Sequence, residues 1–230
     1  MTKILKTSVS VLVIFAVVMS ADYVYRFLRG EEEKSFLAYI LSNGEYLLNL
    51  VNKQNSLEKY TPADLVDLAQ LGAKGKQIRR LAYDSLTQLI NAAKSDNVNL
   101  RILSAYRSYE KQKSLFSFYS RFFKNASRFS AEAGHSEHQL GTAIDFGSGN
   151  SRTDLTAKFA ETAQGKWLLS RAWQYGFILS YPEGKEVATG YIYEPWHYRF
   201  VGIQTAKECH DLGLFSYECL SRKPQYYYEK

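Results

Sequence analysis

Hydrophobic positions in the middle of the chain follow two different periods. Between residues 78 and 93 they recur every three or four positions, which predicts an amphipathic helix. Apolar and polar residues alternate over residues 98–102, as expected of a half-buried strand. Helical spacing returns in a stripe that carries four aromatic rings and comprises Leu115, Phe116, Tyr119, Phe122 and Phe123. We expect this second stripe to pack in the core.

The second half of the chain contains shorter periodic segments separated by turn-forming residues. The predicted helices are residues 165–175 and 202–212, and the predicted strands are residues 143–146, 177–181 and 187–193. Gly176 and Gly213 follow the two helices directly, where a left-handed cap is favoured. Residues 182–185 have the composition of a turn. These segments predict an α+β fold in which helices surround a small antiparallel sheet.

The N-terminus departs from this pattern. Lys3 and Lys6 precede an apolar run over residues 9–19, and the small residues Ser20 and Ala21 follow it. This arrangement is typical of a secretory signal peptide, and the run is shorter than the ~20 residues of a membrane span. An uncleaved signal anchor is the alternative. In both cases the protein is expected to be exported, to the periplasm or the outer side of the membrane.

The remaining chain is long enough for one well-buried domain. Its predicted parts are a signal peptide or anchor (1–21), a spacer or helical lead-in (22–49), a catalytic domain (50–222) and a tail (223–230). The formal net charge is +6, but no dense Lys/Arg stripe or nucleic-acid motif is present, so no nucleic-acid partner is expected. A modest basic surplus favours approach to an anionic polymer such as a cell wall.

The chain has two cysteines, Cys209 and Cys219. An even number of cysteines in an exported protein favours a disulfide, here one that closes a short C-terminal loop. Cys209 is followed by His210 and Asp211, which superficially suggests a cysteine hydrolase. Neighbouring residues on a helix point in different directions, so we reject that triad.

Two segments contain the residue types of a catalytic zinc site. The first places His138 seven residues before Asp145, and the second places Glu194 three residues before His197. Two imidazoles and one carboxylate leave a fourth zinc position open to water, and a nearby Glu can accept a proton from it. A seven-residue separation points to opposite faces of a strand, so one of the first pair must lie in a loop. His135 is an alternative ligand.

Three motifs in this order closely resemble the VanY-like D-alanyl-D-alanine carboxypeptidases. They are Ser104–Tyr109 with Gln112, Ser136–Asp145, and Tyr193–Gly202. The resemblance implies a zinc D-Ala-D-Ala peptidase (hedgehog-like) fold with a Zn²⁺ cofactor. It also implies that the metal ligands are His138, Asp145 and His197, that the catalytic residues are Glu194 (base) and Arg107 (oxyanion), and that the substrate contacts are Ser136, Gln112, Arg107 and Trp196.

The predicted activity is therefore removal of the terminal D-alanine from peptidoglycan stem peptides by an exported, monomeric zinc carboxypeptidase. An L,D-carboxypeptidase acting on tetrapeptide stems would use the same metal chemistry and is the nearest alternative. A peptidoglycan-binding module without catalysis is the alternative from a different class. Retention of both Glu194 and the complete ligand set argues against the binding module. Membrane contact is expected only through a possible N-terminal anchor.

Overall fold

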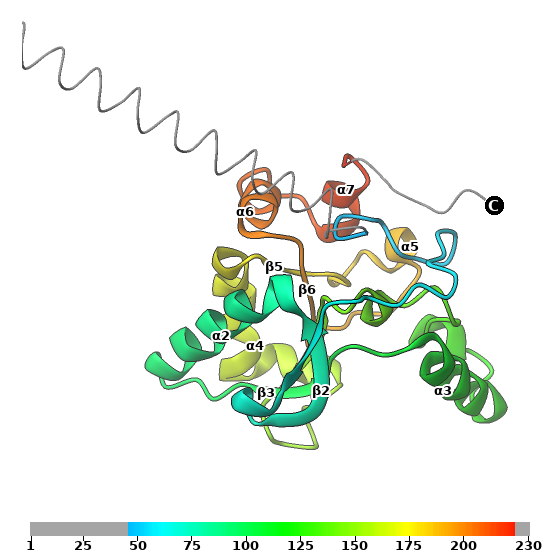
Figure 1. Cartoon of the computed structure of the whole chain (residues 1–230), viewed down its shortest axis with the longest axis horizontal. Coiled ribbons are helices and arrows are strands. Elements are labelled where there is room, and N and C mark those ends of the chain that lie inside the picture. The colour runs from blue at the N-terminus through cyan, green and yellow to red at the C-terminus, as the bar shows by residue number, and fades with distance from the viewer. Residues whose placement is uncertain (1–45, 224–230) are drawn as a thin grey trace, which may run out of the picture. The chain divides into compact units, whose positions relative to one another are not determined.

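The described domain contains a four-stranded antiparallel sheet whose strands, in spatial order, are β3 (Arg101–Ser104), β4 (Ala143–Gly147), β6 (His197–Phe200) and β5 (Phe177–Leu179) (Figure 1). This computed structural model describes residues 46–223. The predicted signal segment, most of the spacer and the tail beyond Lys223 lie outside these residues. Within residues 46–223, no helix has both the length and the apolar character needed to cross a membrane.

The sheet is short-stranded, and a separate two-stranded hairpin precedes it. The hairpin strands are β1 (Leu65–Leu68) and β2 (Ala73–Arg79). The α-helices are α2 (Arg80–Ser95), α3 (Tyr109–Phe122), α4 (Ala163–Arg171), α5 (Glu186–Thr189), α6 (Ile203–Asp211) and α7 (Ser216–Leu220). Short 3₁₀ turns include η2 (Ala126–Arg128), η3 (Glu137–Leu140) and η5 (Ala172–Tyr175). The predicted α+β class is confirmed.

Helix α2 packs as its sequence period predicts. Its buried positions are Ala82, Leu86, Leu89 and Ala93, which lie on one side of the helix. The start of the predicted helix is wrong, because Ile78 belongs to β2 and pairs with Val66 of β1. Periodicity did not reveal this hairpin, because β1 has only four residues and β2 is mostly polar.

Helix α3 differs from the prediction in what it buries. The chain enters it through Ser108, whose hydroxyl accepts a hydrogen bond from the Lys111 N–H. Gln112 is the buried residue of this helix, whereas Phe122 and Phe123 of the predicted stripe are 68% and 52% exposed. The expectation that the aromatic stripe packs in the core is therefore wrong for these rings, because α3 projects from the domain beyond its first turns (Figure 1).

The predicted strand at 187–193 is also wrong. Residues Glu186–Thr189 form the short helix α5, which ends at Gly190 with a φ of +79°. The partner of β5 is instead β6, and Phe177 lies opposite Phe200. A short apolar run is compatible with helix or strand, and here the pairing of distant segments decided between them.

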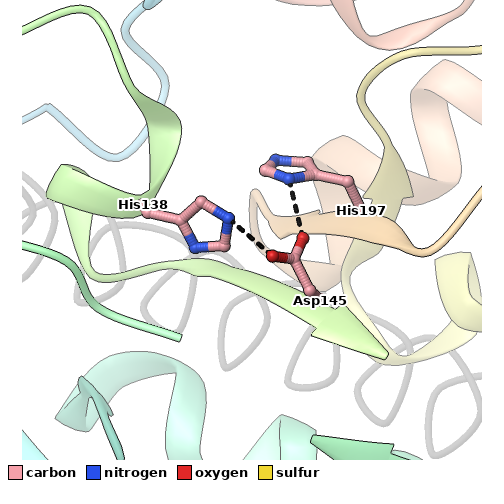
Figure 2. Close-up of side chains that lie close together, drawn as sticks. All are labelled: His138, Asp145 and His197. Carbon is pink, nitrogen blue, oxygen red and sulfur yellow. Dashed lines mark hydrogen bonds and ion pairs between the residues drawn. The ribbon is translucent and has the colours of Figure 1, made fainter. Parts of the chain in front are cut away.

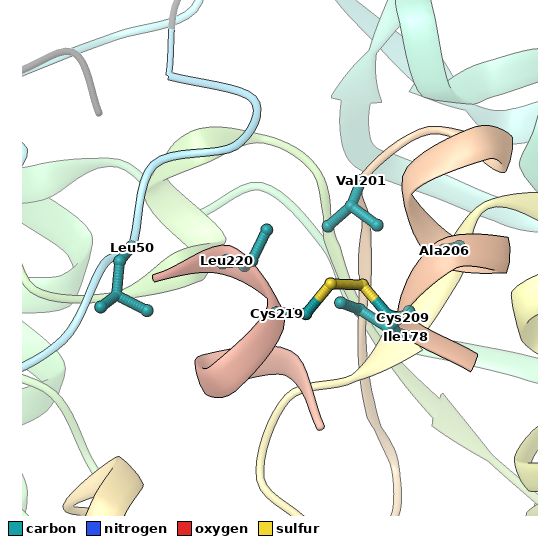
Figure 3. Close-up of a cluster of buried hydrophobic side chains, with 7 residues drawn as sticks. All are labelled: Leu50, Ile178, Val201, Ala206, Cys209, Cys219 and Leu220. Carbon is teal, nitrogen blue, oxygen red and sulfur yellow. A yellow bond between two sulfur atoms is a disulfide. The ribbon is translucent and has the colours of Figure 1, made fainter. Parts of the chain in front are cut away.

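The predicted disulfide joins the two C-terminal helices to each other. Cys209 of α6 and Cys219 of α7 are bonded, which confirms this expectation. The bond lies in a buried cluster (Figure 3) whose other members are Leu50, Ile178, Val201, Ala206 and Leu220. This cluster ties α6 and α7 to strand β5 and to the start of the domain.

Candidate active site

The register of the central sheet places two predicted ligands side by side. In the β4–β6 pair, Asp145 is directly opposite His197. Side chains of directly opposed residues share one face of a sheet and lie close together. The Nδ1 atom of His197 is 3.0 Å from Oδ1 of Asp145. Sheet pairing therefore joins two residues that are 52 positions apart in sequence.

The third predicted ligand comes from a turn, as its spacing required. His138 lies in η3, which ends at Gly141 with a φ of +72°. A side chain at Gly141 would meet Cγ of Arg79 at 2.9 Å, so both the backbone conformation and the available space favour glycine. The reversal turns the His138 ring back over β4, where its Nε2 is 3.1 Å from Oδ2 of Asp145.

These three side chains converge on one point (Figure 2). One donor atom from each of His138, Asp145 and His197 lies within 4.8 Å of the others, and all three residues are buried. Two nitrogens and one carboxylate oxygen form a donor set typical of catalytic zinc with an open coordination position. The residues present therefore fit a zinc ion. His135 is not part of this group, because its Nδ1 contacts the carbonyl oxygen of Asn52 at 2.7 Å.

The outward-facing ring nitrogens of both histidines have hydrogen-bond acceptors. Nδ1 of His138 donates to the Ala105 carbonyl at 2.8 Å, and Nε2 of His197 donates to Oε2 of Glu137 at 3.0 Å. Each acceptor fixes which nitrogen carries the proton, and the other nitrogen is left to face the metal. His138 would therefore bind through Nε2 and His197 through Nδ1.

Glu137 is a site residue that the sequence analysis missed. It is buried, and its Oε1 accepts a hydrogen bond from Arg199 at 3.0 Å, while its Oε2 accepts one from Ser180 at 2.5 Å. Arg199 is itself fully buried and donates to the carbonyl of Leu47. The signal was present, because Glu137 lies within the motif between two residues assigned to the site. Without pairing information it reads as a surface charge.

Burial and neighbouring charges shift the protonation of these groups in opposite directions. Burial acts to raise the pKa of Glu137, but the Arg199 charge and the His197 and Ser180 hydrogen bonds outweigh it and lower the pKa to about 2. Burial acts to lower the pKa of His197, but its bonds to Asp145 and Glu137 raise the pKa to about 10 in the metal-free protein. Metal binding at His197 must therefore release a proton.

Glu194 lies beside this group in the loop before β6. Its Oε2 is 3.9 Å from Nδ1 of His197, and it is 8% exposed. Burial raises the pKa of Glu194 to about 8 in the metal-free protein, partly offset by the His197 charge. A carboxyl group with a raised pKa next to a metal site is suited to accept and return a proton near neutral pH.

Arg107 reaches the same group from the segment between β3 and α3. Its Nη2 is 4.0 Å from Oδ2 of Asp145, and its Nη1 donates to Oε1 of Gln112 at 2.8 Å. Gln112 is fully buried, and its Nε2 donates to the Ala131 carbonyl. Both ends of the Gln112 amide are therefore used within the protein. Gln112, expected as a substrate contact, is placed behind Arg107 and holds its guanidinium in position.

Comparison with known proteins agrees with this geometry. Residues 75–203 match the family model described as VanY, D-alanyl-D-alanine carboxypeptidase. The chain belongs to this family. It is 40% identical over 182 residues to the putative carboxypeptidase YodJ of Bacillus subtilis strain 168, covering 76% of this chain and 67% of that protein.

Two solved structures resemble the VanY-family fold seen here. One is the LdcB LD-carboxypeptidase, with a TM-score of 0.69 and 38% identity, covering 78% of this chain and 88% of that one. The other is a Zn(II) complex of the vancomycin resistance D,D-pentapeptidase VanY from the VanB-type cassette, with a TM-score of 0.64 and 32% identity. That match covers 76% of this chain and 99% of the other. The chain is a zinc metallocarboxypeptidase.

A cavity of about 350 Å³ opens over the metal group of this VanY-family domain. Ser136 and Trp196, both expected substrate contacts, line it together with Arg107 and Glu194. The rest of its lining includes residues absent from the predicted site, namely Leu115, Tyr119, Phe129, Leu155, Tyr181, Tyr191 and Ile192. An apolar, aromatic wall opposite a few polar groups is typical of small-ligand sites.

Proposed function

We propose that this enzyme removes the terminal D-alanine from peptidoglycan stem pentapeptides, with His138, Asp145 and His197 as zinc ligands. One observation carries the proposal. The three donors, Glu194 and Arg107 meet at the floor of a single cavity that is large enough for a peptide end. When bound, zinc supplies a Lewis acid that polarises the scissile carbonyl and makes water more acidic.

The chain's own residues divide the remaining chemistry. Glu194 accepts the proton of the attacking water and returns it to the nitrogen of the leaving D-alanine. The guanidinium of Arg107 faces the oxygen on which negative charge develops in the transition state. Its fixed positive charge stabilises that oxygen. The orientation of the guanidinium is held by the hydrogen bonds to Gln112 and Ser104. Ser136 and Trp196 bind the substrate from the cavity wall.

The direct test is hydrolysis of a synthetic stem pentapeptide by the purified protein, followed by mass spectrometry. We expect loss of one alanine in the presence of zinc, no loss after chelation, and recovery when zinc is restored. Binding of the pentapeptide without cleavage, unaffected by Glu194→Ala, would instead support a non-catalytic peptidoglycan-binding module.

A second candidate is an L,D-carboxypeptidase activity that removes D-alanine from tetrapeptide stems. The specific observation in its favour is that the LdcB LD-carboxypeptidase is among the similar structures, at 38% identity. The same metal chemistry serves both substrates. Side-by-side kcat/KM values for tetrapeptide and pentapeptide stems distinguish the two, and the D,D-activity predicts preference for the pentapeptide.

We also infer that the protein acts outside the cytoplasm, in the periplasm or at the outer face of the membrane, as a monomer. The Cys209–Cys219 disulfide supports an oxidising location, and the signal-like residues 1–21 support export. Fractionation with antibody detection tests the location, and light scattering of the purified protein tests the monomer. Whether the N-terminal segment is cleaved is read from the mass of the mature protein.

A further inference from the structure

The side of α3 that lines the active-site cavity continues beyond it. Leu115 and Tyr119 belong to the cavity wall. Together with Phe118 and Phe122 they have the spacing i, i+3, i+4, i+7, so all four residues lie on one side of the helix. The side chains of Phe118 and Phe122 are 54% and 68% exposed. The cavity wall therefore extends outward as a row of exposed rings.

These rings are in contact with one another. The ring centroids of Phe118 and Phe122 are 5.0 Å apart, and those of Tyr119 and Phe129 are 5.4 Å apart. Phe123 is 52% exposed and joins the second pair, 5.7 Å from Phe129. We call these five residues the α3 aromatic surface. An exposed apolar patch that continues a ligand cavity marks a binding surface rather than incidental exposure.

The length of α3 matches the length of the substrate. Gln112, which holds Arg107, lies at the inner end of the helix, and Phe122 lies ten residues further along, about 15 Å at 1.5 Å per residue. An extended stem of four or five residues spans about 13–18 Å. A stem peptide that lies along α3 with its C-terminus at Glu194 would therefore bring its N-terminal end to Phe118 and Phe122.

In peptidoglycan, the N-terminal end of the stem is attached to an amino-sugar of the glycan strand. We propose that the α3 aromatic surface binds this glycan, so that the enzyme recognises the sugar as well as the peptide. The proposal rests on the proposed peptidoglycan carboxypeptidase function. Pyranose rings present apolar C–H faces that pack against aromatic rings, and Phe118 and Phe122 offer such rings at the required distance.

The charge around this surface is consistent with the same ligand. From residue 111 to residue 131 the chain carries five basic side chains and no acidic one. Peptidoglycan stems carry free carboxylates, so the basic flank attracts the substrate towards the aromatic surface. An anionic lipid surface would share this attraction, but it would not explain why the rings continue the wall of the substrate cavity.

The test compares two substrates that differ only in the sugar. The kcat/KM of the full-length protein is measured for a free pentapeptide stem and for the same stem carrying its disaccharide. We expect the disaccharide form to be preferred by roughly tenfold, as two aromatic contacts allow. In the Phe118→Ser/Phe122→Ser variant this preference should fall to about one, because kcat/KM for the disaccharide form falls more than kcat/KM for the free peptide.

The matched control is Leu169→Ser, which removes an apolar side chain of similar exposure (65%) from α4. It should leave the preference intact. Equal turnover of both substrates by the wild-type protein, or a preference that survives the double substitution, would overturn the proposal. If the double substitution instead weakened binding to anionic vesicles and left the preference unchanged, the surface would be assigned to lipid.

Failure of the proposed function gives a different result. A protein that cleaves neither substrate contradicts the carboxypeptidase activity and not the glycan surface. In that case, the affinities of the Glu194→Ala protein for the two stems, measured by calorimetry, decide the inference. Tighter binding of the disaccharide form that depends on Phe118 and Phe122 would support it, and equal affinities would contradict it.

Discussion

Glu137 accepts a hydrogen bond from Nε2 of His197, on the opposite side of the ring from the Nδ1 atom that faces Asp145. Because Nε2 keeps its proton in this bond, Nδ1 is the nitrogen whose lone pair binds zinc once the metal has displaced the Nδ1 proton. Arg199 holds the other oxygen of the Glu137 carboxylate. A metal ligand on β6 is therefore oriented by a carboxylate on η3, immediately beside the ligand His138.

Replacing Glu137 by Gln should weaken zinc binding. The amide keeps nearly the same shape but loses the negative charge that pairs with Arg199 and stabilises the His197 ring. We expect zinc affinity to fall by about 10–100-fold, the usual effect of removing a partner of a metal-bound histidine. Competition with a chromophoric chelator measures this change.

Ser180→Ala is the matched control for Glu137→Gln, because it removes one hydrogen bond from the same carboxylate and leaves the Arg199 pair intact. We expect a smaller loss of zinc affinity. Circular dichroism establishes that both variants fold, and Glu137→Asp, which retains the charge, should recover part of the affinity. A folded Glu137→Gln protein with wild-type zinc affinity would show that Glu137 has no role in metal binding.

Replacing Glu194 by Ala should lower kcat strongly without removing the metal. The side chain lies 3.9 Å from His197 but is not among the three grouped donors, so the zinc content should remain near that of the wild type. Loss of a general base lowers kcat by about 10²–10⁴-fold. Glu183→Ala, which removes an exposed carboxylate from the preceding turn, should leave kcat unchanged. Near-normal turnover by Glu194→Ala would exclude it as the base.

Replacing Arg107 by Lys should lower kcat and leave the zinc content close to that of the wild type. Lys retains the charge but cannot keep the two-sided hold on Gln112 and Ser104. Losing one aligned oxyanion donor costs about 10²–10³-fold in kcat. Arg101→Lys, at an exposed position on β3, provides the control. If both substitutions left kcat unchanged, Arg107 would have no part in the reaction.

The metal-free protein should lose stability as the pH rises through the range in which Glu194 ionises. Burial raises the pKa of Glu194 from 4.5 to about 8, so in that interval the folded state holds a proton that the unfolded state releases. The stabilising contribution is complete below the unfolded pKa and disappears as the pH rises through about 8. Glu194→Gln cannot ionise and should lack this dependence.

Urea unfolding of the wild-type and Glu194→Gln proteins is measured in chelator from pH 4 to 9. The two proteins share all other titratable groups, so the difference between their unfolding free energies isolates the contribution of the Glu194 carboxyl. The Gln variant should become progressively more stable than the wild type as the pH rises. Parallel pH profiles for the two proteins would show that the Glu194 carboxyl ionises in the folded state at its ordinary pKa.

Removing the disulfide should lower stability and spare catalysis. The Cys209–Cys219 bond closes a loop of ten residues, which constrains the unfolded chain by about 2–3 kcal/mol. Its buried cluster contains none of the metal-binding residues. The Cys209→Ala/Cys219→Ala variant should therefore melt at a lower temperature with an unchanged kcat/KM at 25 °C. A loss of activity at temperatures where the variant is fully folded would mean that the cluster supports the site.

Much of the catalytic chemistry could be predicted from local sequence. His138, Asp145, Glu194 and His197 lie in two short motifs, and the types of these residues suit a catalytic zinc site. The need for a turn between His138 and Asp145 also followed from spacing alone, because a strand alternates its faces every residue. Helix α2 and the cap at Gly176 were predictable for the same reason, since both depend on near neighbours.

Only the tertiary structure decided which distant segments meet. Pairing of β4 with β6, rather than of residues 177–181 with 187–193, sets Asp145 opposite His197. The same folding buries Glu137 against Arg199 and leaves Phe122 exposed, although sequence suggested a surface charge and a core ring. Burial depends on what the rest of the chain places against a residue. A local period records which side of an element is apolar, but it does not specify whether that side faces the core, a substrate or solvent.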